Sequence, residues 1–109
     1  MKIKKFLLIL TFPFLLNTLT SFADEAKMTK GLEIFNETAG CAACHVLKAA
    51  GSEGNIGPNL DTVEGLNYNS VMDIVTHGLG VMPAFGEDEI LTKEEIDIVS
   101  FYVANSVSK

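Results

Sequence analysis

The sequence lacks tryptophan and arginine, and it contains only two cysteines and two histidines in 109 residues. Its eight basic residues face fourteen acidic ones, which gives a formal net charge of −6. An acidic surface repels phosphate groups, so the composition argues against a nucleic-acid partner. No internal repeat, low-complexity run or interdomain linker is visible. No apolar run approaches the roughly 20 residues that a membrane-spanning helix needs.

Residues 1–23 have the layout of a secretory signal peptide. Met1 to Lys5 is short and positive, Phe6 to Leu16 is almost wholly apolar, and Ser21-Phe22-Ala23 carries small residues at the positions that a signal peptidase reads. The alternative is a retained membrane anchor, for which the apolar run is too short. We therefore expect cleavage after Ala23 and no stable membrane anchor afterwards. The destination is the periplasm, or a compartment like the thylakoid lumen.

Residues 24–109 would then form a single small domain. It keeps five lysines and all fourteen acidic residues, so its formal charge is −9. Such a surface suits a partner with a basic docking patch. A domain of this size buries so little apolar surface that its folded state is only marginally stable. We therefore expect a disulfide, a metal or a cofactor to stabilise it further.

Helical periodicity dominates the rest of the chain. Residues 27–37 place Met28, Leu32 and Phe35 on one apolar stripe. Gly31 interrupts this predicted helix at a cost of about 1 kcal/mol relative to alanine, which indicates close approach by another helix.

Two further helices are predicted in the C-terminal half. Ser70 and Asp73 form a potential capping box for a short helix over residues 71–77. Thr92 and Glu95 form another, followed by a long apolar row that begins at Ile96. No segment alternates with period two for long enough to indicate a sheet. We therefore expect an all-α fold of three or four short helices joined by long loops.

Two glycine-containing loops separate these helices. Residues 46–66 include Gly51, Gly54, Gly57 and Gly65, and residues 78–86 contain Met82-Pro83. Loops this long in so small a domain normally enclose something.

Both cysteines lie in Cys41-Ala42-Ala43-Cys44-His45, written CAACH. A disulfide between them would close too short a loop to stabilise the fold much. The C-x-x-C-H spacing is typical of c-type haem attachment. Two cysteines three residues apart each add to one haem vinyl group, and the following histidine is held where its imidazole binds the iron. Attachment through Cys41 and Cys44 would also stabilise the small domain further.

Two other chemistries use the same side chains. A thiol–disulfide exchange motif would need a βαβ context, which the sequence does not indicate. Zinc could take Cys41, Cys44, His45 and His77, but adjacent Cys44 and His45 would have to turn toward one ion.

A haem that only transfers electrons needs a second axial ligand. Met28 and Met72 fall on apolar helical stripes, where core packing is the simpler role. Met82 lies in a loop and precedes Pro83, which would stiffen the backbone that holds the sulfur. His77, at the end of a predicted helix, is the other candidate. We therefore predict His45 and Met82 as iron ligands.

The whole of residues 24–109 resembles the class I single-haem cytochromes c. The resemblance rests on five features in order: the Gly31…Phe35 spacing, CAACH, Gly57-Pro58-Asn59-Leu60, Val81-Met82-Pro83-Ala84-Phe85, and the aromatic-bearing last helix. The Met-Pro-Ala-Phe-Gly phrase is similar to that of small photosynthetic carriers of algae and cyanobacteria, and related phrases occur in respiratory cytochromes.

The resemblance implies a class I cytochrome c fold wrapped around one covalently bound haem c. It implies that the Pro58 carbonyl accepts a hydrogen bond from His45 and that Leu60 packs on the haem face. It also implies that Gly31 and Phe35 cross the last helix near Ile98 and Phe101. The chain departs from many relatives in having no tryptophan near a propionate and no ring of lysines around the haem edge.

Together these observations predict an electron-transfer protein and not an enzyme. The favoured interpretation is a soluble one-electron carrier that binds redox donors and acceptors transiently. One alternative is a dedicated haem subunit of an extracytoplasmic dehydrogenase or oxidase. The other is a haem enzyme or gas sensor with an open iron.

Overall fold

The computed structural model describes residues 21–108, so most of the predicted signal peptide lies outside the described residues. Residues 21–33 are helical and run directly into a π-helical turn, η1 (Ile34–Thr38). Two further α-helices follow, α2 (Tyr68–His77) and α3 (Lys93–Ser106). The remaining elements are short: η2 (Cys41–Ala43), β1 (Val46–Leu47), η3 (Lys48–Ala50) and β2 (Ser52–Glu53). The prediction of a mainly helical fold is confirmed.

The start of α3 matches its sequence signal. The Glu95 backbone N–H donates to Thr92 Oγ1 at 3.1 Å, and the Thr92 N–H donates to Glu95 Oε1 at 3.0 Å. Two otherwise unpaired donors at the helix N-terminus are satisfied in this way.

The start of α2 was predicted wrongly. The helix begins at Tyr68, with Asn67 and not Ser70 as its N-cap. The Asn67 side chain accepts from the Ser70 N–H, and the Ser70 hydroxyl lies 3.0 Å from the Asn67 N–H, which donates to it. Asparagine is as good an N-cap residue as serine. Asn67 is therefore the N-cap, and Ser70, three residues later, supplies the second side chain of the capping box.

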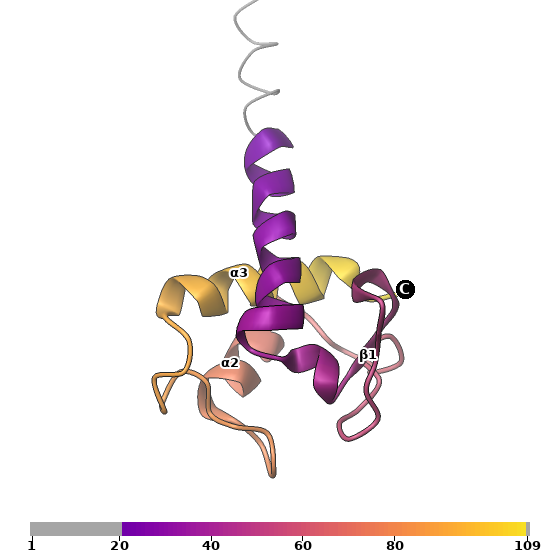
Figure 1. The fold of residues 1–109 in the computed structure, drawn as a ribbon, viewed down its shortest axis with the longest axis vertical. Helices are drawn as coiled ribbons and strands as arrows, with labels where there is room; N and C mark the ends of the chain where they lie inside the picture. Colours follow the sequence, from indigo (N-terminus) through magenta and orange to yellow (C-terminus); the bar gives the residue numbers. More distant parts are fainter. Residues whose placement is uncertain (1–20, 109) are drawn as a thin grey trace, which may run out of the picture.

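The first helix crosses α3 (Figure 1), and Gly31 lies at the crossing. A Cβ added to Gly31 would lie 2.2 Å from Tyr102 Cβ and 3.2 Å from the Ile98 carbonyl oxygen. The close approach predicted from Gly31 is therefore present, with Tyr102 rather than Phe101 as its main contact. Phe35, one turn further on, packs beside Tyr102 with ring centroids 6.0 Å apart.

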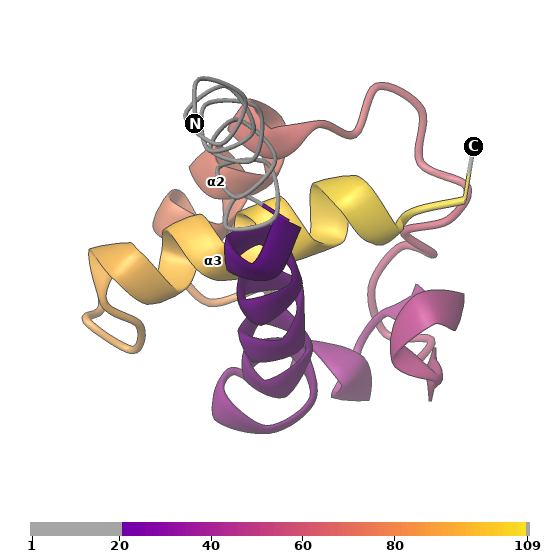
Figure 2. The ribbon, with the colours of Figure 1, turned by 90° about the horizontal axis from the view of Figure 1, so that it is seen from above.

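The end of the first helical segment, α2 and α3 share one apolar core, and Figure 2 shows the first helix crossing α3, with α2 beside α3. The buried hydrophobic residues are Ile34, Phe35, Leu47, Val71, Val75, Phe85, Leu91, Ile96, Val99, Tyr102 and Val103.

The segment after CAACH folds back as a small antiparallel hairpin, in which Val46 pairs with Glu53 and Leu47 with Ser52. Only a loop was predicted here, because strands of two residues are too short to show an alternating pattern in the sequence.

An ion-pair and hydrogen-bond cluster joins the same helices at the surface. Lys27 Nζ lies 3.0 Å from Asp97 Oδ2 and 4.7 Å from the centre of the Phe101 ring. The Tyr68 hydroxyl donates to Asp97 Oδ1. The Tyr68 hydroxyl, followed by Lys27, holds the pKa of Asp97 below its ordinary value of 3.8.

We expect Asp97→Asn to lower the free energy of unfolding at neutral pH by less than about 1 kcal/mol, because the cluster is partly exposed. Since the folded pKa of Asp97 is depressed, this stability is present above its ordinary pKa and is lost as pH falls through the lower folded value. Urea unfolding at a series of pH values measures the difference, which should shrink below pH 3.8. Asp88→Asn, at an exposed loop position, is the control; an equal and pH-independent loss in both variants would contradict the prediction.

Candidate functional site

An apolar cavity of about 400 Å³ is lined by residues of CAACH, of the segment 56–66, of helices α2 and α3, and of the loop 79–85. Its volume is within the range of about 300–1,000 Å³ typical of ligand pockets. None of its lining residues is a lysine, aspartate or glutamate. All six predicted site residues line it: Cys41, Cys44, His45, Pro58, Leu60 and Met82. We call it the CAACH cavity.

His45 is fixed in one orientation by the loop that follows. Its Nδ1 lies 2.7 Å from the Pro58 carbonyl oxygen, so the neutral ring donates through Nδ1 and leaves Nε2 as the acceptor. Gly57 packs flat against the ring, since a Cβ there would lie 2.6 Å from His45 Cε1. A side chain at position 57 would displace the ring. This is the arrangement of a metal-binding imidazole, whose second nitrogen is oriented by a backbone carbonyl.

The loop that carries Met82 is tied to the end of α2. The Phe85 N–H donates to the Val75 carbonyl at 2.9 Å, and the Leu79 and Met82 backbones pair with each other across a tight turn. Gly78 has φ +73°, and a Cβ there would lie 2.7 Å from the Met82 carbonyl oxygen. The loop is therefore folded tightly enough to hold Met82 at a defined place on the cavity wall.

The two cysteines are free thiols at the edge of the same cavity. Burial raises the pKa of Cys41 from 9.0 to about 11, so its thiol stays protonated at neutral pH. Thiol–disulfide exchange depends on a cysteine whose pKa is lowered, so this microenvironment argues against a redox dithiol. The fold also provides no βαβ unit around CAACH within residues 21–108.

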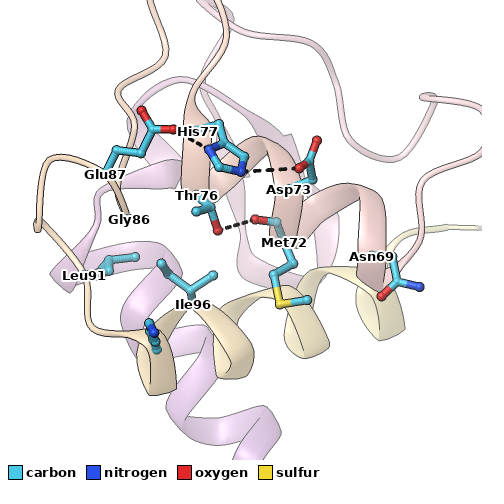
Figure 3. A pocket seen from close by; sticks show the side chains of 10 residues that line it. Asn69, Met72, Asp73, Thr76, His77, Gly86, Glu87, Leu91 and Ile96 are labelled. Carbon is cyan, nitrogen blue, oxygen red and sulfur yellow. Dashed lines mark hydrogen bonds and ion pairs between the residues drawn. The ribbon is translucent and has the colours of Figure 1, made fainter.

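His77 lies in a different place, an open groove of about 600 Å³ between α2 and α3 (Figure 3). Its Nδ1 is hydrogen-bonded to Glu87 and its Nε2 lies 3.6 Å from Asp73 Oδ1. Glu87 raises the pKa of His77, with Asp73 adding to the effect. An imidazole whose two nitrogens both face carboxylates is poorly placed to bind iron.

The position of His77 also bears on zinc. His77 does not line the CAACH cavity, so it does not join the cysteines and His45 there. Within residues 21–108, no group of three or more histidine, cysteine, aspartate or glutamate side chains is arranged to hold a metal ion.

The chemistry of the CAACH cavity fits a haem. Two thiols are available for thioether bonds, an oriented imidazole and a thioether sulfur are available for the iron, and the lining is uncharged. Several further hydrophobic residues that line the cavity had no assigned role from the sequence, among them Ile56, Val63, Leu66, Ile74, Leu79 and Val81. Five of these six lie in the two loops that were expected to enclose something, but loop residues show no periodicity that marks which ones face inward.

The fold and the CAACH site define a class I c-type cytochrome with one haem c attached through Cys41 and Cys44. The family model described as cytochrome c oxidase, cbb3-type, subunit III matches residues 26–103, and the chain belongs to that family. It is an electron-transfer protein and not an enzyme.

A solved structure supports the same conclusion. The c-type cytochrome SorU from Sinorhizobium meliloti is 44% identical in sequence and superimposes with a TM-score of 0.69. The match covers 78% of this chain and 95% of the SorU chain. A comparison with curated proteins found no match. No helix within residues 21–108 is long and apolar enough to cross a membrane.

Proposed function

We propose that this cytochrome is a mobile one-electron carrier whose iron is bound by His45 and Met82. The observation that carries the proposal is the presence of both side chains on one uncharged cavity, with His45 oriented by the Pro58 carbonyl. The bound haem supplies a one-electron couple between ferric and ferrous iron. With both axial positions of the iron filled by protein ligands, no position is left for oxygen or a substrate. The protein can then transfer electrons without catalysing a reaction at the iron.

The protein residues would control that couple in three ways. The Pro58 carbonyl makes the His45 imidazole more basic. The sulfur of Met82 favours the ferrous state and raises the potential relative to a second histidine. The apolar lining disfavours the additional charge of the ferric state, which acts in the same direction as the sulfur. Leu60 would pack on the haem face and help to exclude water.

The negative net charge of residues 24–109 favours redox partners with a positively charged docking surface. With five lysines and fourteen acidic residues in 24–109, the protein attracts redox partners that carry basic docking patches. Encounters of such carriers are brief and bury little surface, and electrons would pass at the haem edge near Cys41 and Cys44.

We expect the charge of an electron acceptor to decide the salt dependence of the reaction. Oxidation of the reduced protein by tris(phenanthroline)cobalt(III), a cation, should slow as ionic strength rises from about 0.01 to 0.15 M, because the Debye length falls from about 30 to 8 Å. Oxidation by ferricyanide, an anion, should accelerate over the same range. Stopped-flow absorbance measures both rates. The same salt dependence with both acceptors would contradict steering by the acidic surface.

The family match favours a second candidate, a dedicated haem subunit of an extracytoplasmic oxidase. Purification of the native protein from membranes at low and high salt separates the two roles. A carrier held only by its charge is released as the salt concentration rises, whereas a subunit co-purifies with its enzyme in stable proportion at low and high salt.

We also propose that residues 1–23 are a signal peptide and that the mature domain works in the periplasm. The alternative destination is a compartment like the thylakoid lumen. N-terminal sequencing of the native protein tests the cleavage: a mature chain that begins at Asp24 supports it, and an intact Met1 contradicts it.

A further inference from the structure

Three successive carbonyl groups at and after the end of CAACH each accept a hydrogen bond from the segment that follows. The Cys44 carbonyl accepts from the Gly57 N–H at 2.7 Å, and the Val46 carbonyl accepts from the Leu60 N–H at 3.0 Å. The His45 carbonyl between them accepts from the Ser52 hydroxyl at 2.9 Å. Ser52 therefore provides the one side-chain bond in a row otherwise made by backbone groups.

The Ser52 hydroxyl is also occupied as an acceptor. The Leu47 N–H donates to it at 3.0 Å, and Leu47 is fully buried. Ser52 itself is only 7% exposed, so water does not readily take the place of its hydroxyl. Without it, the Leu47 N–H and the His45 carbonyl would each lack the partner that they have here, and a buried group without a partner costs about 1–3 kcal/mol.

Close packing binds the same segment to CAACH. A Cβ added to Gly54 would lie 2.6 Å from the Ala43 carbonyl oxygen and 2.7 Å from the Cys44 carbonyl carbon. Gly57 contacts the His45 ring in the same manner. Residues 52–57 thus hold the backbone of CAACH at one end and the imidazole at the other.

We propose that Ser52 is a positioning residue for His45, and that its hydroxyl tunes the haem potential by fixing the His45 peptide. The inference rests on the proposed function of His45 as an iron ligand. If the His45 backbone is free to turn, the bond between Nδ1 and the Pro58 carbonyl weakens. The imidazole then becomes less basic, ferric iron is less stabilised, and the midpoint potential rises.

Ser52→Ala in the mature haem-bearing protein tests the proposal. We expect exchange of the Leu47 amide proton and of the His45 Nδ1 proton to become about fivefold faster by NMR, and the midpoint potential to rise. Ser52→Thr keeps the hydroxyl and should return all three readouts toward those of the natural protein. Ser100→Ala is the matched control, because it removes the hydroxyl of a fully buried serine that has no hydrogen-bond partner.

An unchanged potential and unchanged His45 proton exchange in Ser52→Ala, with only a lower unfolding midpoint, would show that Ser52 is merely structural. If Ser52→Ala does not fold, proton exchange in the natural protein tests the proposal instead. Rapid exchange of the Leu47 amide and Ser52 hydroxyl protons overturns the proposal, and slow exchange supports it. Absence of iron-induced shifts on His45 in the natural protein would overturn the ligand assignment itself. The shifts on His45 are measured in the natural protein before any variant is made. A failure of the ligand assignment is therefore distinguishable from a failure of the Ser52 proposal.

Discussion

Replacing Met82 with alanine should lower the midpoint potential and open the iron to external ligands. The thioether favours the ferrous state, and its loss leaves water or hydroxide to stabilise the ferric state. Axial ligands tune haem potentials over about 0.8 V, so we expect a fall on the order of 0.1 V or more. Redox titration followed by absorbance measures the fall. The oxidised variant should also lose the weak charge-transfer band of the sulfur–iron bond, and the reduced variant should bind carbon monoxide rapidly.

His77→Ala is the matched control for Met82→Ala. His77 lies in the groove between α2 and α3, paired with Glu87 and Asp73, and not on the CAACH cavity. Its replacement should leave the spectrum, the potential and the slow reaction with carbon monoxide unchanged. If His77→Ala opened the iron while Met82→Ala did not, the ligand assignment would be wrong. Rapid carbon monoxide binding by the natural protein would instead favour the gas sensor or haem enzyme.

The sequence was informative about the fold wherever a local rule decides the structure. Thr92 and Glu95 cap α3 as predicted, because a capping box depends on residues three apart. Gly31 marked a helix crossing, because glycine is costly inside a helix without such a reason. The cap of α2 was missed, because Asn67 and Ser70 are both good capping residues and only the tertiary arrangement chooses between them.

The site was predictable where its functional residues are adjacent in the sequence. The pentapeptide CAACH by itself indicates a covalently bound haem, and Met82-Pro83 is a methionine in a loop, where a packing role is less expected. Ser52 gave no such signal, because a serine in a glycine-rich loop resembles any other turn residue. The role that we propose for it depends on a hairpin that returns it to His45, and a hairpin of two-residue strands leaves no periodic pattern in the sequence.

The Gly31 crossing leads to the largest expected loss of stability. Gly31→Ala would raise helix propensity by about 1 kcal/mol, so a free helix would gain from the change. In the folded protein the new Cβ would lie 2.2 Å from Tyr102 Cβ and 2.9 Å from Tyr102 Cγ. Carbon atoms pack at about 3.5–4.0 Å, so the helices must separate by more than about 1 Å. Overpacking of this kind costs about 1–3 kcal/mol or more, which exceeds the gain in propensity.

We therefore expect Gly31→Ala to lower the free energy of unfolding by about 2 kcal/mol and the melting temperature by roughly 10 °C. Urea and thermal unfolding of the haem-bearing protein measure both. Thr29→Ala, at an exposed position of the same helix, raises propensity without a clash and should be neutral or stabilising. The strain should also reach the haem, because Val99 and Val103, which flank Tyr102 on α3, line the CAACH cavity. A Gly31→Ala protein as stable as Thr29→Ala would mean that the two helices are not held at this crossing.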